Sequence, residues 1–136
     1  MIVIDASVFV AAIVEDELDI FSQEIYDLIV TKERNAIVPS IFYYETSNVF
    51  LQILRRKRIT EEKCDVYLQI LSSFPLLLDT EQTVLEVANL AKLYNLTVYD
   101  AAYLEVAKRN GYPLATLDKR LMVAALNANV KLELNL

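Results

Sequence analysis

Short runs of apolar residues recur along the chain, and most are followed by longer segments in which apolar residues repeat every three or four positions. The runs lie at residues 2–4, 36–38, 76–78 and 114–116. Apolar runs of this length are typical of strands that are buried on both faces of a parallel sheet. We therefore predict four such strands, and a final strand over Val130–Leu134.

Predicted helices lie between these strands, and this alternation is typical of an α/β fold with a parallel sheet and helices on both faces. No repeat or linker interrupts the pattern, so we expect one domain over residues 1–136 with a short sheet of four to five strands. The expected helices are Ala6–Val14, a helix starting at the acidic Glu15–Glu17, a helix capped by Ser40 and running to about Arg56, a helix capped by Thr60 and stopped by Pro75, a helix from Thr80 to about Leu93, a helix capped by Asp100 and ended by Gly111, and a helix from Asp118 to about Leu126.

Composition excludes several classes of catalytic site. The chain has no histidine, so it cannot contain a Ser-His-Asp or Cys-His nucleophilic site. Its single cysteine, Cys64, permits neither an intrachain disulfide nor a thiolate zinc site. Its single glycine, Gly111, excludes a Gly-rich phosphate-binding loop of the usual form. Carboxylates remain as candidate ligands, and they suit hard cations such as Mg²⁺ and Mn²⁺.

The formal net charge of −6 disfavours nucleic acid in general, so a phosphate substrate would need a local basic patch or a bound cation. No apolar segment is long enough to cross a membrane, and the sequence shows no basic secretory leader. We therefore expect no membrane association and a cytoplasmic location.

Two of the acids occupy informative positions. Asp5 ends the first apolar run, at the carboxyl end of a predicted central strand, where open α/β sheets bind ligands; it could equally cap the following helix. Glu45 lies between Ile41 and Val49 on one helical stripe, so its side chain is expected to be buried. No Lys or Arg precedes Arg55 in this helix to neutralise it. Its partner is then a distant base or a cation, unless the helix is rotated and Glu45 is solvated.

Asp100 and Asp118 each stand where a helix is expected to begin, and helix capping alone explains each one. Both would nevertheless point from the same sheet edge as Asp5, where Ser7 and Thr116 add hydroxyl groups. Carboxylates gathered there would repel one another and raise some of their pKa values unless a divalent cation compensates them. We therefore predict that one or two Mg²⁺ or Mn²⁺ ions are held by Asp5, Glu45, Asp100 and Asp118.

The chain contains one basic run, which is a candidate for RNA binding if the fold brings it beside the acids. It could also be a solvated helix end, where cations complement the helix dipole. The run consists of Arg55, Arg56, Lys57 and Arg58.

Aromatic residues beside Glu45 and Asp100 raise a separate question. Phe42, Tyr43 and Tyr44 cannot all face the core from one helix, so an exposed ring could stack a base or contact a protein. Tyr103 follows Asp100 by one turn and is expected to lie in the core.

Four segments together resemble the PIN-domain family, and most closely its VapC-type ribonuclease toxins. Their order and spacing and the length of the chain all match, so the resemblance covers essentially the whole sequence. One difference is that Lys119 follows Asp118, where some relatives carry a further acid. The segments are Ile2–Ser7 (IVIDAS), Val38–Ser40 leading to Glu45 and Asn48, Thr97–Tyr103 (TVYDAAY) and Leu114–Leu121 (LATLDKRL).

The resemblance implies a PIN-like three-layer fold and a Mg²⁺- or Mn²⁺-dependent endoribonuclease that hydrolyses RNA with metal-activated water. Similar toxins are homodimers and are blocked by a cognate antitoxin protein whose tail enters the active-site groove. We therefore expect the toxin of a type II toxin–antitoxin pair. The implied acids are Asp5, Glu45, Asp100 and Asp118, with Ser7, Asn48 and Thr116 as supporting polar residues.

Two other functions remain open from the sequence. One is a catalytically silent PIN-like module that binds protein or RNA. The other is an aspartyl-phosphate phosphotransfer domain with Asp5 as the acceptor, although one such class usually needs a second acid two residues later, where this chain has Ser7.

Overall fold

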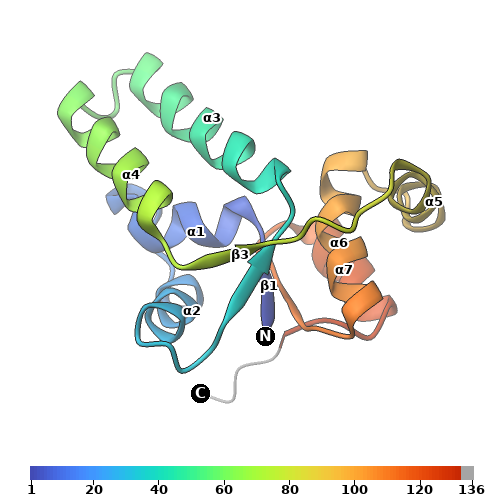
Figure 1. Ribbon diagram of the computed structural model, residues 1–136. Helices are drawn as coiled ribbons and strands as arrows, with labels where there is room; N and C mark the ends of the chain where they lie inside the picture. Colours follow the sequence, from blue (N-terminus) through green and yellow to red (C-terminus); the bar gives the residue numbers. More distant parts are fainter. Residues whose placement is uncertain (133–136) are drawn as a thin grey trace.

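A computed structural model describes residues 1–132 of the chain and confirms the predicted α/β architecture. The described strands form one parallel sheet of four strands in the order β3-β2-β1-β4. Helices cover both faces of this sheet and give a three-layer arrangement (Figure 1). The elements are β1 (Ile2–Ile4), α1 (Ala6–Ile13), the 3₁₀ turn η1 (Glu15–Glu17), α2 (Ile20–Val30), β2 (Ala36–Val38), α3 (Ile41–Arg55), α4 (Glu61–Ser73), β3 (Leu76–Leu78), α5 (Val84–Tyr94), α6 (Val98–Asn110), β4 (Leu114–Ala115) and α7 (Lys119–Asn127).

Strand β1 lies inside the sheet because all three of its side chains are apolar and can be buried on both faces. Val3 pairs with Ile37 of β2 on one side and with Leu114 of β4 on the other. Since every pair is parallel, the carboxyl ends of the strands meet at one edge of the sheet. The residues that follow β1, β2 and β4 therefore begin at this edge.

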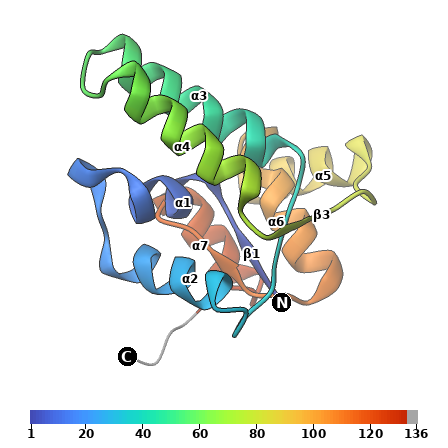
Figure 2. The same ribbon diagram turned by 60° about the vertical axis from the view of Figure 1, so that its left-hand side comes forward.

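The helices form two groups on opposite sides of the sheet. Helices α1 and α2 lie on one side with the α3–α4 hairpin packed across α1, and α6 and α7 lie on the other with α5 against α6 (Figure 2). Phe9 of α1 is the centre of the first group. Its ring lies 5.1 to 6.4 Å, between centroids, from the rings of Tyr26, Phe42, Phe50 and Phe74.

Two predictions about capping in the first half of the chain are wrong. The acidic Glu15–Glu17 does not start the second helix, which begins at Ile20 because Asp19 accepts the amide hydrogen bond of Ser22. Ser40 does not cap α3, since its backbone is already helical and its side chain makes no capping hydrogen bond.

Two further helix starts are displaced from their predicted positions. Helix α5 is capped by Thr83 and not opened by Thr80. Helix α6 is capped by Thr97, whose hydroxyl accepts the amide of Asp100 at 3.1 Å, so Asp100 lies inside the first turn. The predicted caps of Thr60 and Asp118 and the left-handed Gly111 that ends α6 are confirmed.

The predicted final strand is wrong as far as the described residues test it. Over residues 130–132 the chain makes only an isolated parallel bridge between Lys131 and Leu114. The rest of that prediction lies in residues 133–134, outside the described part.

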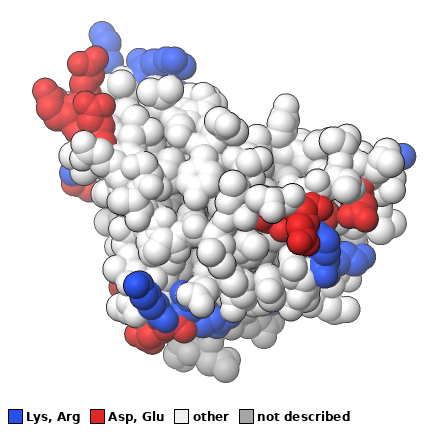
Figure 3. All heavy atoms as spheres, in the orientation of Figure 1, with Lys and Arg blue, Asp and Glu red and all other residues white. Residues whose placement is uncertain are grey.

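Charged groups lie mainly near the margins of the face shown in Figure 3, and most of the surface over β3 is uncharged. Leu77 and Leu78 of β3 are exposed there. No helix among the described residues is long and apolar enough to cross a membrane.

The position of Phe9 makes it a test of the core. We expect Phe9→Ala to lower the free energy of unfolding by about 3–5 kcal/mol, because the surrounding rings cannot fully close the cavity. Urea denaturation followed by circular dichroism would measure the loss. Val84→Ala, at a side chain that is 83% exposed, is the control and should change stability by less than about 0.5 kcal/mol. Equal midpoints for the two variants would contradict this description of the core.

Candidate active site

Asp5 follows β1 directly and is buried, with 5% of its surface exposed. Its Oδ1 accepts hydrogen bonds from the Ser7 hydroxyl at 2.6 Å and the Val8 amide at 3.2 Å, and its Oδ2 accepts one from the Thr116 hydroxyl at 2.5 Å. Burial raises the pKa of Asp5 to about 6, although these hydrogen bonds oppose the rise, and the charge of Asp100 adds to it. Asp5 therefore caps α1 and also stands at the carboxyl edge of the sheet.

Hydrogen bonds continue from Asp5 to the segment that carries Asp118. The Ser7 hydroxyl accepts the amide hydrogen bond of Leu117, and the Thr116 hydroxyl accepts that of Asp118, each at 3.0 Å. Asp118 is exposed and its carboxylate caps α7. The structure thus brings Ser7 and Thr116 to Asp5 and ties Asp118 to the same network through its backbone.

Glu45 is half-buried, between the buried side chain that the helical stripe predicts and the solvated one that a rotated helix would give. The buried face of α3 includes Phe42, Thr46 and Phe50, and Glu45 lies beside that face. Its Oε1 accepts a 2.6 Å hydrogen bond from the hydroxyl of Tyr103. This partner is neither of those expected, a base or a cation. Tyr103 itself lies in the core, as predicted.

The Tyr103 hydroxyl is held as a donor in this contact. Burial, followed by the hydrogen bond to Glu45 and the charges of Glu45 and Asp5, raises the pKa of Tyr103 well above its usual range. The hydroxyl therefore keeps its proton and fixes one carboxylate oxygen of Glu45. The other predicted polar residue of α3, Asn48, is exposed one turn further on.

Asp100 is the acid that connects the others electrostatically. It is half-buried, and burial together with repulsion from Asp118 and Glu45 raises its pKa, while the hydrogen bond with Thr97 and the attraction of Arg120 oppose the rise. Asp100 in turn contributes to the raised pKa of Asp5. Acids from four separate segments therefore influence one another across this edge of the sheet.

The donor set fits a hard cation by its chemistry, but the carboxylates are not closed around one point. Within residues 1–132, no three Asp, Glu or Cys side chains lie close enough together to hold a metal ion. Mg²⁺ usually takes only one or two protein carboxylates and completes its shell with water and substrate oxygens. No salt bridge in the described part of the chain neutralises any of the four acids. Asp5 and Asp100 therefore remain suitable for such a water-rich site.

A groove of about 370 Å³ begins beside Ser7. Ser7 and other residues of α1 form one wall, and Val49 of α3 and Leu117 line it as well. Glu17 also lines the groove. The groove gives a substrate room next to Asp5, because Ser7 both lines the groove and donates a hydrogen bond to that carboxylate.

The basic run lies at the far end of α3, about 15 Å along the helix axis from Glu45. Arg58 is held by Asp16 at 2.5 Å and by Glu17 at 3.1 Å. Residues 55–57 are exposed. The run is therefore on the same helix as one of the acids, but part of its charge is already neutralised.

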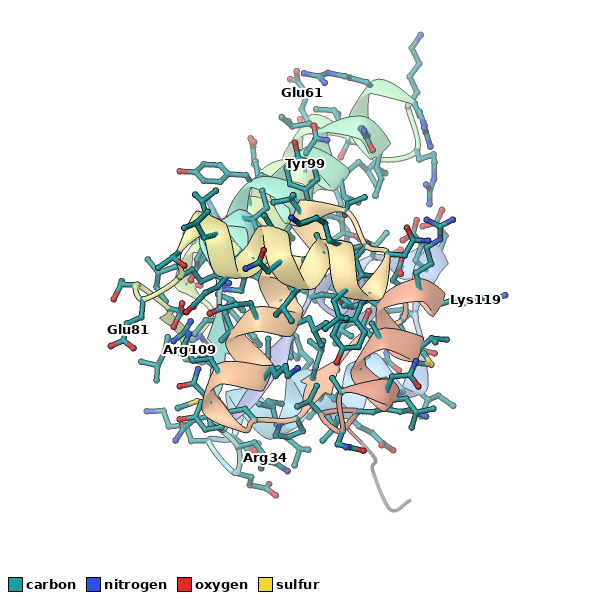
Figure 4. All side chains as sticks on the ribbon, turned by 90° about the vertical axis from the view of Figure 1, so that its right-hand side faces the viewer. Arg34, Glu61, Glu81, Tyr99, Arg109 and Lys119 are labelled. Atoms are coloured by element: carbon teal, nitrogen blue, oxygen red, sulfur yellow. The ribbon has the colours of Figure 1, made fainter. Side chains whose placement is uncertain are left out.

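A second charged network, which was not predicted from the sequence, joins α6 to the segment before α5. Arg109 donates to Glu105 at 2.6 Å and to Asp79 at 2.8 Å, and Gln82 donates to Glu105 at 2.9 Å. Figure 4 shows Arg109 and Glu81 together beside α6, and their side chains are 3.5 Å apart. The spacing of Glu105 and Arg109 by one helical turn was the available signal.

The crystal structure of PAE2754 from Pyrobaculum aerophilum is similar to this chain, with a TM-score of 0.71 and 24% sequence identity over 90% of this chain and 82% of that one. At this identity the likeness shows a shared fold alone. No curated protein matches the chain. The PIN domain family matches residues 2–126, which include all four acids, and the chain therefore belongs to the PIN-domain family.

Proposed function

We propose that this PIN-domain protein is an endoribonuclease that depends on Mg²⁺ or Mn²⁺. PIN domains are generally nucleases. The observation that supports the proposal most strongly is that acids from separate segments lie near one edge of the sheet, where Asp5 is bound to Ser7 and Thr116 and Glu45 to Tyr103. Burial first, and then repulsion from Asp118 and Glu45, raises the pKa of Asp100 there. Such repulsion favours the binding of a divalent cation between the acids.

The side chains have different roles in this proposal. Asp5 and Asp100 would hold the cation, with Glu45 and Asp118 contributing directly or through water. Ser7 and Thr116 hold the two oxygens of the Asp5 carboxylate in place, and Tyr103 does the same for Glu45. A bound divalent cation would lower the pKa of a coordinated water and stabilise negative charge on the phosphodiester oxygens.

The toxin role, the homodimer and the cognate antitoxin are part of the same proposal, with the cytoplasm as the site of action. The motifs that resemble VapC-type toxins support them. The exposed Leu77 and Leu78 on the edge strand β3 also suit a protein partner, because apolar edge strands are usually covered. Residues 55–57 and Arg58 remain the proposed contacts for the RNA backbone.

A catalytically silent binding module is the second candidate. It is favoured by the lack, within residues 1–132, of three acids already gathered at metal-binding distance. Calorimetric titration with Mn²⁺ separates the two functions, because a module of that kind would bind no ion at Asp5 and Asp100.

Replacing either acid should abolish activity. We expect Asp5→Asn and Asp100→Asn each to lower cleavage of a fluorescent RNA oligonucleotide by at least about 100-fold, since the variants lose a charged ligand. Both should keep the wild-type circular dichroism spectrum, because Asn can replace Asp5 as a helix cap, and Asp100 is a half-buried residue inside the first turn of α6 whose replacement by Asn leaves the cap at Thr97 intact. Cleavage by the wild-type protein should stop in EDTA and return with Mn²⁺. Full activity in EDTA would refute the proposal.

The raised pKa of Asp5 predicts a stability change without metal. Because the folded-state pKa lies near 6 and the pKa of an unperturbed Asp is 3.8, the folded protein binds more protons than the unfolded chain between these values. Stability contributed by this group is therefore present below pH 4 and is lost as the pH rises through 6. In EDTA, Asp5→Asn should raise the free energy of unfolding by about 1–3 kcal/mol at pH 7.5 and much less at pH 4.5. Parallel urea denaturation at the two pH values would show this. A uniform effect across pH would contradict it.

The toxin role has its own test. Induced expression of the wild-type chain in a bacterial host should arrest growth, and Asp100→Asn should not, because growth arrest requires RNA cleavage. Immunoblotting must show equal amounts of both proteins. Growth arrest by Asp100→Asn as well as by the wild-type chain would argue against toxicity through the nuclease site.

A further inference from the structure

Two exposed tyrosines stand next to the acids. Tyr44 is 73% exposed and immediately precedes Glu45, and Tyr99 is 61% exposed and immediately precedes Asp100. The chain has 5 Phe and 8 Tyr residues. Of the aromatic residues within residues 1–132, only Tyr44 and Tyr99 are exposed. Both exposed tyrosines therefore adjoin a candidate metal ligand in the sequence.

The core does not use either ring. Of the three consecutive aromatic residues in α3, Phe42 is fully buried, Tyr43 is half-buried and Tyr44 points to solvent. Neither Tyr44 nor Tyr99 belongs to an aromatic pair among the described residues. Each leaves a large apolar surface in water, which burial would otherwise stabilise.

The two rings belong to one region of the surface. The hydrogen bond of 2.6 Å between Tyr103 and Glu45 joins the N-terminal halves of α6 and α3, and Tyr99 and Tyr44 lie in the first turns of these helices. Neighbouring residues of a helix point about 100° apart, so each ring can reach past its acid into the solvent. Figure 4 shows Tyr99 on the side of the molecule where α3 lies, opposite Arg34.

We propose that Tyr44 and Tyr99 stack on unpaired bases of the RNA that the acids bind, so that the substrate is single-stranded at the site. The proposal rests on the proposed nuclease function. Stacking on an aromatic ring works for any base and needs no positive charge. It therefore supplies affinity that a chain of net charge −6 does not gain from its overall electrostatics. RNA is favoured over a protein partner because each ring immediately precedes an acid that is proposed to hold the metal ion for RNA cleavage.

Fluorescence tests the contact directly, because the chain contains no tryptophan. Tyr44→Trp and Tyr99→Trp each introduce a single indole, and a single-stranded RNA oligonucleotide in EDTA should quench both without being cleaved. The same sequence in a duplex should quench much less. Val84→Trp, on the exposed surface of α5, is the matched control and should stay unquenched. No quenching at the two sites, or equal quenching in the control, would overturn the proposal.

Binding and kinetics give the second measurement. Tyr44→Leu and Tyr99→Leu should each raise the Kd for the single-stranded oligonucleotide by about 5- to 150-fold, and Tyr→Phe at the same positions should recover most of the affinity because the ring is kept. In cleavage assays the Leu variants should raise KM more than they lower kcat. Unchanged Kd values in the Leu variants would overturn the proposal. If the Leu variants instead sediment as a different oligomer from the wild-type protein, the rings belong to a protein interface and the proposal is also overturned.

These outcomes separate this proposal from the nuclease function. Quenching of both indoles by RNA, without cleavage by the wild-type chain, would support the stacking tyrosines and refute the nuclease. Cleavage with unaffected Leu variants would refute the stacking role alone.

Discussion

A carboxylate removed from water at the end of a central strand is the feature on which the site is built. Asp5 is buried, so its oxygens need donors, and these come from α1 and from the segment after β4. The same donors, Ser7 and Thr116, accept hydrogen bonds from the backbone leading to α7. Satisfying one buried acid therefore joins two segments that are distant in sequence, residues 5–8 and 116–118.

Helix α6 brings the second half of the site to this point. Its first turn carries Asp100, and Tyr103 reaches from the same helix to Glu45 on α3. The contact holds helices from opposite sides of the sheet together through one hydroxyl. The acids keep their charge because neutral hydroxyl groups hold Asp5 and Glu45 in place without cancelling it. Repulsion from Asp118 and Glu45 therefore adds to burial in raising the pKa of Asp100.

Much of the architecture was predictable because the strands are short apolar runs and the sheet is parallel. Asp5 could be placed for the same reason: the apolar run ends there abruptly. The starts of the helices were harder to predict, because neighbouring residues can both act as caps. Thr80 and Thr83 compete before α5, and Thr97 and Asp100 compete at α6, and tertiary packing selects between them.

The partner of Glu45 was beyond sequence reasoning. Its distance from Tyr103 is 58 positions along the chain, and no local pattern links them. The rotation of α3, which leaves Glu45 at the edge of the buried face, depends on how Phe42, Thr46 and Phe50 pack against their neighbours. The charged network of Arg109 carried a local signal in its helical spacing with Glu105, but its contacts to Asp79 and Gln82 needed the fold.

That network has a mechanical consequence for α6. Arg109 lies nine residues after Asp100, about 13 Å along the helix axis. Its bonds to Glu105 and Asp79, with Gln82 bound to Glu105 and to the carbonyl of Ala102, anchor the helix to the segment that leaves β3. Any axial sliding of α6 would have to break these contacts at the same time as it displaced Asp100. The contacts of Arg109 near the end of α6 therefore help to hold Asp100 in position near its start.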